Sequence, residues 1–511
     1  MSKSVRLDRV NPVLVKEVRQ AVRGKSFRSS FIMVLTIAAV VSTTVLSSLN
    51  VDDPQDLANS GTNLFFALHA VFLFCALVVV PVQANRSMAS ERDERTFDAL
   101  IISGLSPAQI ISGKWLSAGV TQLLFLVALL PFFATSATLY GLDLLMAFVM
   151  TLFACFLGLT LSLLGILAAT LSKSKAVGSV LMMVFLAACG FSMMWMIAMG
   201  QMTMSGFGGF GNTDEFLVIM GLLSAASFFT LFWLHGLAVA TISHQEENGM
   251  LRVRWAVLSC ALFIGIAPLI LMSTVPVTPM RFLFQLNSMG VMVLGVLNVP
   301  LLTESVGMRV RCRHELESGS WRRPFSWLFL PGGGTAYLLF LVQILIVAIP
   351  TTIYLMLASS GSGIYQDLSI YFENGFGGLL ATLGVVLACT GVPAAFAARA
   401  AAPLWARNSL RFFILTLPFW IVILLGIVEL LFQMTGAGFL DSALNPFIAI
   451  GDNFRSLRKP EAVLFWLALA GLGSVPMLMH AARQRAEIKA LRRTTSESDS
   501  NVASPEEEPE A

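Results

Sequence analysis

The stretch SERDERTFDALIISGLSPAQIISGKW, residues 90–115, lies between two long apolar runs at 62–84 and 115–139. Its first nine residues carry charges of alternating sign, and the rest mixes apolar side chains with turn-forming residues. A run of about 20 apolar residues is long enough to cross a bilayer as a helix. A charged segment between two such runs indicates a chain that crosses the membrane repeatedly and holds an ordered element outside it.

Apolar runs of this length recur along all 511 residues, of which 56% are hydrophobic and only 12% charged. The mean hydropathy is +0.78. Soluble proteins carry about twice that charged fraction, which excludes a soluble fold. We predict an all-α polytopic membrane protein with about twelve transmembrane helices in two six-helix blocks. The expected spans are 31–49, 62–84, 115–139, 144–171, 177–200, 216–242, 255–275, 282–303, 334–357, 372–398, 410–434 and 462–482.

The distribution of positive charge predicts the orientation of these spans. With the N-terminus inside and the connections alternating, all but four of the 33 Lys and Arg residues fall in inner segments; the exceptions are Arg281, Arg455, Arg458 and Lys459. Basic residues favour the cytoplasmic side. We therefore expect a multi-pass protein of the inner or plasma membrane with both termini in the cytoplasm. No cleavable signal peptide is recognised, so the first span is the expected insertion signal.

Residues 1–30 predict an amphipathic helix on the cytoplasmic membrane surface. Asn11 is placed to cap it and Pro12 to occupy its first position. The apolar side chains that follow recur with the helical period and are flanked by Lys and Arg, which suits the headgroup layer. A solvated basic tail is the alternative interpretation.

The remaining chain divides into a block at 31–245, a second block at 246–485, and a tail. In both blocks the largest inner connection follows the second span. The tail, 486–511, is rich in Ser and Glu, and we expect it to be disordered, acidic and cytoplasmic.

The first of these large connections predicts a helical hairpin at 90–114. Ser90 is expected to cap its first helix, in which Glu91 and Arg95 stand one turn apart in the favourable order for an ion pair. Gly104 is expected to end that helix. An ordinary solvated loop is the alternative.

The second helix of the hairpin is predicted to begin at Ser106 and Pro107 and to continue through Lys114 into the third span. An apolar ridge faces the cytoplasm near the turn and is formed by Phe97, Leu100, Ile101 and Leu105. An exposed amphipathic helix of this kind suits a groove on a partner protein. A continuous helix would carry a push on the hairpin into the membrane.

These residues resemble the ABC-2 type transporter permease family. In that family the second span is followed by a Glu-rich stretch, a Thr-x-x-x-Leu step, a Leu–Ser turn and a Gly–Lys pair. The matching positions here are Glu91, Arg95, Thr96, Leu100, Leu105, Ser106, Pro107, Ile110, Gly113 and Lys114. The opening at 11–23 and Pro131 are also similar, so the resemblance covers roughly residues 10–245. Phe97 and Asp98 depart from the small or apolar residues common in the family.

The resemblance implies the membrane subunit of an ABC transporter, with a separate ABC ATPase as partner and export as the direction. It implies an ATPase-coupling interface made of Glu91, Arg95, Thr96, Phe97, Leu100, Leu105, Ser106, Pro107 and Lys114. The corresponding connection of the second block, 304–333, is basic and lacks the Glu-x-x-x-Arg-Thr stretch, so we interpret that block as divergent. Two arrangements stay open: either the two blocks form one translocator, or two copies of the chain pair as a homodimer.

Several classes of function find no support in the residues. The phosphate-binding pattern G-x-x-x-x-G-K-[ST] is absent, since Arg19 stands where Gly24–Lys25–Ser26 would need a glycine. The cysteines are widely spaced, and no catalytic or metal-ligating constellation emerges. We therefore expect neither enzyme activity nor a cofactor nor a nucleic-acid partner, but contact with membrane lipid.

Two other functions stay open. An ion-coupled secondary transporter of 6+6 architecture fits the span count, although such carriers place charged residues at the midplane. A membrane scaffold without transport activity is the other. Ionisable residues in or near the spans are functional candidates by default, but a structural role is favoured for each of the four; they are His69, His235, Asp143 and Glu429.

Overall fold

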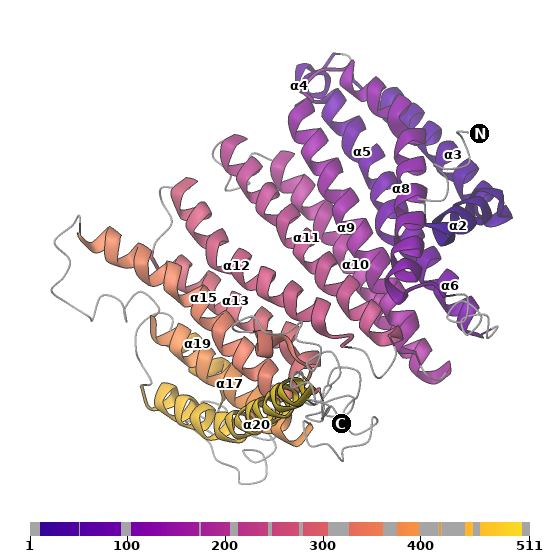
Figure 1. Cartoon of the computed structure of the whole chain (residues 1–511). Coiled ribbons are helices and arrows are strands. Elements are labelled where there is room, and N and C mark those ends of the chain that lie inside the picture. The colour runs from indigo at the N-terminus through magenta and orange to yellow at the C-terminus, as the bar shows by residue number, and fades with distance from the viewer. Residues whose placement is uncertain are drawn as a thin grey trace, which may run out of the picture. The chain divides into compact units, whose positions relative to one another are not determined.

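Long helices make up the structure, and no β-strand occurs among the described residues. The computed structural model describes residues 11–50, 52–93, 104–172, 175–204, 213–243, 248–274, 280–304, 326–360, 376–397, 417, 421, 445–452 and 460–502. The chain separates into unit 1, Met1–Ser243, and unit 2, His244–Ala511. Figure 1 shows the helices of both units.

The helices of unit 1 are α2 (Pro12–Arg23), α3 (Lys25–Ser48), α4 (Pro54–Ala58), α5 (Ser60–Phe74), α6 (Val80–Asp93), α8 (Pro107–Ala137), α9 (Leu144–Leu171), α10 (Lys175–Met204) and α11 (Thr213–Ile242), with a π-helical turn, η1 (Cys75–Val79), between α5 and α6. The long helices run side by side, while α4 lies at one end of the bundle and the end of α6 at the other (Figure 1). Helix α9 is central, because it packs against α11, α6, α10 and α8.

The helices of unit 2 are α12 (Leu251–Thr274), α13 (Met280–Leu302), the 3-10 turn η2 (Ser326–Phe329), α15 (Gly333–Ser360), α17 (Phe376–Ala397), α19 (Pro446–Asp452) and α20 (Pro460–Val502). Helix α17 packs against α20 and α13, and α15 packs against α12, α13 and α20.

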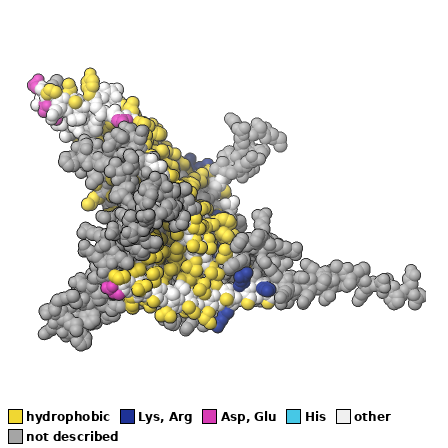
Figure 2. Space-filling model, turned by 90° about the vertical axis from the view of Figure 1, so that its left-hand side faces the viewer, with side chains coloured by type: hydrophobic (Ala, Val, Ile, Leu, Met, Phe, Trp, Pro, Cys, Tyr) yellow, Lys and Arg dark blue, Asp and Glu magenta, His cyan; other side chains and the backbone are white. Residues whose placement is uncertain are grey.

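Ten of the described helices are long and apolar enough to cross a membrane, and they match ten of the twelve predicted spans. The predicted span 372–398 corresponds to α17, whose apolar part, Phe376–Gly391, is shorter. The predicted span 410–434 lies outside the described residues apart from Leu417 and Ile421. Hydrophobic side chains form most of the described surface in Figure 2, as expected for helices that face lipid.

Two local expectations are wrong. Helix α6 continues through Ser90, whose hydroxyl donates to the Ser87 carbonyl 3.2 Å away, so Ser90 does not begin a new helix. The segment 486–502 of the predicted disordered tail belongs to α20, since the strong helix formers after His480 extend the last span beyond its apolar part. Residues 503–511 of that tail lie outside the described residues.

A buried ion pair closes one end of unit 2. The side chains of Arg254 in α12 and Glu304, just after α13, are 0% and 4% exposed and lie 2.9 Å apart. Arg254 also donates to the carbonyls of Leu328 and Gly332, at 2.7 and 3.0 Å, before α15. Gln484 of α20 accepts from the Thr335 amide at 3.1 Å. Buried charges require partners of this kind, so the pair joins α12 and the end of α13 to the start of α15, and Gln484 fastens α20 to the same segment.

Replacement of Arg254 by Met should therefore destabilise unit 2, because Glu304 would stay buried without its counter-ion. We expect a loss of about 3 to 5 kcal/mol in the free energy of unfolding. Arg252→Met is the matched control, since Arg252 lies one half-turn earlier on α12 and is exposed; its effect should stay within about 0.5 kcal/mol. Thermal unfolding of the detergent-solubilised protein measures both, and equal melting temperatures for the two variants would contradict the assignment.

Candidate functional site

The structure describes both ends of the predicted hairpin but not its middle. The described part of α6 reaches Asp93, and α8 begins at Pro107. Four of the predicted coupling residues lie outside the described residues; they are Arg95, Thr96, Phe97 and Leu100. The pairing of Glu91 with Arg95 therefore stays a prediction.

The start of α8 has the predicted form. Gly104 adopts a positive φ of 77°, which glycine reaches without strain. Ser106 caps the helix by accepting a hydrogen bond from the Gln109 amide, and the Gln109 side chain accepts one from the Ser106 amide in return. Pro107 occupies the first helical position, and Leu105 is half-buried just before it. This reciprocal cap fixes where the chain re-enters a helix after the hairpin.

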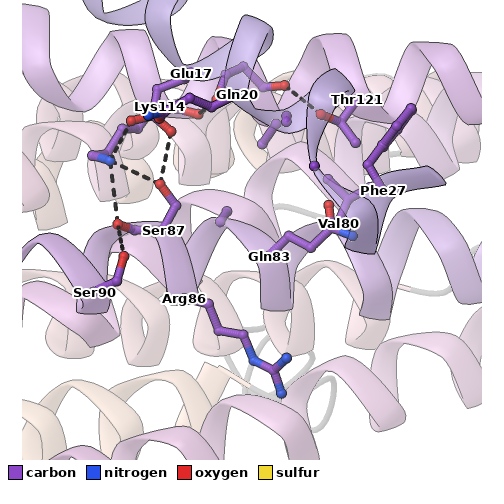
Figure 3. A pocket seen from close by; sticks show the side chains of 15 residues that line it. Glu17, Gln20, Phe27, Val80, Gln83, Arg86, Ser87, Ser90, Lys114 and Thr121 are labelled. Atoms are coloured by element: carbon purple, nitrogen blue, oxygen red, sulfur yellow. Dashed lines mark hydrogen bonds and ion pairs between the residues drawn. The ribbon is translucent and has the colours of Figure 1, made fainter. Parts of the chain in front are cut away.

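Lys114, two turns into α8, is almost fully buried and lies between two carboxylates. Its Nζ is 2.9 Å from Oε1 of Glu17 in α2 and 2.9 Å from Oε2 of Glu91 in α6. It also donates to the Ser87 hydroxyl at 2.9 Å. These four residues, here called the Lys114 node, join α2, α6 and α8, and Figure 3 shows Lys114, Glu17 and Ser87 together.

The node is further tied at its edges. The Ser87 hydroxyl donates to Oε2 of Glu17 at 3.0 Å, and Nζ of Lys16 lies 3.2 Å from Oε1 of Glu91. The side chain of Lys16 is 48% exposed, whereas that of Lys114 is 2% exposed. An ion pair exposed to water contributes little to the stability of the fold, whereas a buried charge without a partner lowers that stability strongly. Lys114 is therefore the residue on which the node depends.

Helix α2 is also fastened directly to the start of α8. The Asn11 side chain accepts from the Val13 amide, which caps α2 as predicted, and donates to the Gln109 carbonyl at 2.6 Å. Gly113 faces Val13 so closely that a Cβ on Gly113 would come within 2.7 Å of the Val13 Cβ. The small residue thus lets α2 pack tightly against the helix that follows the hairpin.

A pocket of about 440 Å³ borders the Lys114 node between α2, α6 and α8. One wall is apolar and includes Phe27, Val80 and Ala118, and the other carries amide and hydroxyl groups. The side chain of Arg86 points away from the node (Figure 3). The residues that line the pocket are Glu17, Gln20, Ala21, Gly24, Phe27, Val80, Gln83, Ala84, Arg86, Ser87, Ser90, Lys114, Ser117, Ala118 and Thr121.

The second span is interrupted by η1, a π-helical turn at Cys75–Val79 between α5 and α6. It packs against Gly158 of α9, where a Cβ would lie 2.6 Å from the Ala76 carbonyl oxygen. Gln122 of α8 donates to the Cys155 carbonyl at 3.1 Å nearby. A π turn is rare within an α-helix and often marks a functional site. It lies on the same span as Glu91, about four turns away.

The ionisable residues singled out in the spans have structural surroundings. The His69 ring stacks on Phe65 at 5.2 Å, and its nitrogens have no hydrogen-bond partner among the described residues. Asp143 caps α9, as its boundary position suggests. His235 is half-buried in α11, and Glu429 lies outside the described residues. No group of three possible metal ligands occurs in the part of the chain that was described.

Sequence reasoning singled out Lys114 and Glu91 but missed Glu17, Ser87 and Lys16. Only Glu17 carried a detectable signal, because it is the one acidic residue in the otherwise basic α2. An acid within a basic membrane-surface helix is unfavourable beside anionic lipid, so it indicates a cationic partner inside the protein.

Removal of the ammonium group in Lys114→Met should release α2 from α6 and α8, because two carboxylates would then face each other without a counter-ion. We expect a loss of about 3 to 5 kcal/mol in stability and faster hydrogen exchange in 12–23. Lys16→Met makes the same change at the exposed edge of the node and should cost less than about 1 kcal/mol. Unchanged exchange across α2 in Lys114→Met would show that the node does not hold that helix.

Comparison with known families gives one finding. The family model described as ABC-2 family transporter protein matches residues 23–207, which include Glu91 and Lys114 and begin six residues after Glu17. No curated protein and no solved structure gives a significant match to the chain. The matched region lies within unit 1 and spans α3 to α10. The ten helices apolar enough to cross a bilayer make the chain a multi-pass membrane protein, and its residues 23–207 are similar to the ABC-2 family of transporter proteins.

Proposed function

We propose that the chain is an ABC-2 type permease driven by a separate ABC ATPase. The ATPase binds the segment 90–114 on the cytoplasmic side, and its ATP cycle drives export of a cargo across the inner or plasma membrane. The observation that carries the proposal is the Lys114 node, which sits at the base of both arms of that segment. The absence of a phosphate-binding loop in the sequence supports a partner as the source of energy.

The node would make the two arms of the hairpin move together. Glu91 lies at the cytoplasmic end of the second span, and Lys114 lies in the third turn of α8, so their ion pair joins the end of the second span to the start of the third. Glu91 is 12% exposed, and both its carboxylate oxygens already face lysines. We therefore assign Glu91 and Lys114 to positioning the hairpin, and the apolar ridge predicted from the sequence of 97–105 to contact with the ATPase.

A push on the hairpin would travel along α8, which is continuous over 31 residues and about 46 Å long. At its far end the Gly61 amide donates to the Tyr140 carbonyl at 2.9 Å, and the Thr62 hydroxyl donates to the Gly141 carbonyl at 2.6 Å. The second and third spans are thus joined at both ends. The π turn of η1 between these ends is the segment best able to absorb a change of shape.

ATP binding can shift the spans only if the ATPase binds their two arrangements with different affinity. Helix α2 supports such a difference, because it holds the base of the hairpin through Glu17 while its own N-terminus is tied to Gln109. The pocket beside the node leaves space between α2 and α6 on the side of Phe27 and Val80. Movement there would change the packing of the first three spans.

We further propose that two copies of the chain pair, one ATPase on each. The Glu-x-x-x-Arg-Thr stretch occurs once in the chain, in unit 1, whereas an ATPase dimer offers two binding grooves. In unit 2 the acidic residue at the corresponding position, Glu304, is buried in its ion pair with Arg254. Native mass spectrometry of the purified complex should give two permease chains with two ATPase chains.

The ATPase proposal is tested by affinity purification of the full chain from its own membranes. An ABC ATPase should co-purify with the unchanged protein. Charge reversal at both Glu91 and Arg95 should lower its yield at least several-fold, because it alters the hairpin and repels Lys114. Lys16→Met removes a charge next to the same site and should retain the ATPase. Undiminished association in the double reversal would remove the docking role from this segment.

Transport measurements separate the proposed function from its alternatives. Inside-out vesicles should accumulate cargo only with ATP, and Lys114→Met should abolish that uptake. Uptake driven by an ion gradient without ATP would instead identify a secondary carrier. Stable ATPase binding without any nucleotide-dependent change in the accessibility of cysteines placed in α6 and α8 would identify a scaffold.

A further inference from the structure

A second pocket, of about 370 Å³, lies at the end of unit 1 opposite the Lys114 node. It is formed by α4, the start of α5 and the start of α9, and α4 lies at that end of the bundle in Figure 1. Its volume is in the range of small-molecule sites. The lining residues are Gln55, Asp56, Asn59, Thr62, Asn63, Phe65, Phe66, Gly141, Leu142, Asp143, Met146, Ala147 and Met150.

The charge of this lining is one-sided. Asp56 and Asp143 are both exposed carboxylates, and the lining contains no Lys, Arg or His. Asp143 uses Oδ1 to cap α9 through the amides of Leu145 and Met146, so the cap does not occupy Oδ2. Two carboxylates without a basic residue repel anionic ligands and attract cations at any pH where both are ionised.

The rest of the lining selects among cations. The inner wall carries the rings of Phe65 and Phe66 and the thioethers of Met146 and Met150. Aromatic faces attract organic cations, and flexible methionine side chains adapt to apolar groups of irregular shape. A bare metal ion finds no group of three possible ligands among the described residues. The side-chain amides of Gln55, Asn59 and Asn63 add groups for orienting a ligand.

The pocket is held in shape by backbone contacts. The Gly61 amide donates to the Tyr140 carbonyl, which ties the start of α5 to the loop before α9. Gly141 has a φ of 86°, and a Cβ there would come within 2.0 Å of the Ala58 carbonyl oxygen. The close contact of Gly141 with Ala58 and the bond from Gly61 to Tyr140 therefore fix the positions of the two loops that border the pocket. A preformed site loses less free energy on ordering when its ligand binds.

We propose that this pocket binds an amphipathic organic cation, with its charge near Asp56 and Asp143 and its apolar part against Phe65 and Phe66. The identification of that cation as the exported cargo rests on the function proposed above. The second span supports the link, because α5 lines the pocket and α6, beyond η1, carries Glu91 of the Lys114 node. Binding itself requires no ATPase.

The test measures binding of tetraphenylphosphonium to the full chain in nanodiscs of uncharged lipid, with empty nanodiscs subtracted. Triphenylphosphine oxide, neutral and of similar shape, is the ligand control. The double variant Asp56→Asn with Asp143→Asn keeps side-chain size and the cap of α9, because Asn also caps helices. It should weaken binding of the cation roughly tenfold, the size expected for loss of paired charge at a partly exposed site.

Asp52→Asn is the matched control variant. Asp52 is an exposed carboxylate in the turn just before α4 but does not line the pocket, so its removal should leave the affinity within about twofold. Unchanged binding in the double variant, an equal loss in Asp52→Asn, or equal affinity for the neutral analogue would each overturn the proposal.

The two proposals fail separately. Lys114→Met should bind tetraphenylphosphonium as the unchanged protein does while its ATP-driven uptake is lost. If no cation binds, the proposed role of the pocket is overturned, and the test of ATPase association is unaffected. Absence of an ATPase with cation binding intact would overturn the transport function and leave the pocket as a binding site.

Discussion

The ammonium group of Lys114 is buried, and two carboxylates stabilise it there in its charged form. A charge with 2% of its side chain exposed carries a large desolvation penalty, which only close opposite charge and hydrogen bonds can offset. Glu17 and Glu91 supply that charge from two different helices, and Ser87 adds a hydrogen bond. The positions of α2, α6 and α8 relative to one another follow from this requirement. Everything proposed about the hairpin depends on that fixed base.

The two units meet the same requirement in different ways. In each unit an acidic residue at the end of the second membrane span pairs with a basic residue of another helix. The acid is Glu91 in unit 1 and Glu304 in unit 2. Arg254 has a fork of donors and satisfies backbone carbonyls before α15 as well as Glu304, so its surroundings are closed. The point charge of Lys114 binds two carboxylates instead, and one side of its node borders a pocket. Unit 1 therefore has room to rearrange at this end, and unit 2 has little.

Local features of the fold were predictable because their causes are local. Asn11, Ser106 and Gly104 act within a few residues of their own position, and length and apolarity identify ten spans. The Lys114 node was not predictable, since Glu17 and Lys114 are 97 residues apart and only packing brings them together. The π turn also left no signal in the apolar run that contains it. Ser90 was misplaced because a capping residue at the end of a span can equally continue the helix.

The order of the charged residues along the chain also determines how each unit can be assembled during synthesis, which proceeds from the N-terminus. Glu17 and Glu91 are made before Lys114, so the third span of unit 1 enters the bilayer with its counter-ions already present. Arg254 is made 50 residues before Glu304 and must wait near the water interface for its acid. Gln484, which completes the contacts at that end, is made 149 residues after Thr335. Unit 1 can thus mature helix by helix, whereas the contacts of unit 2 are completed only when α20 has emerged from the ribosome.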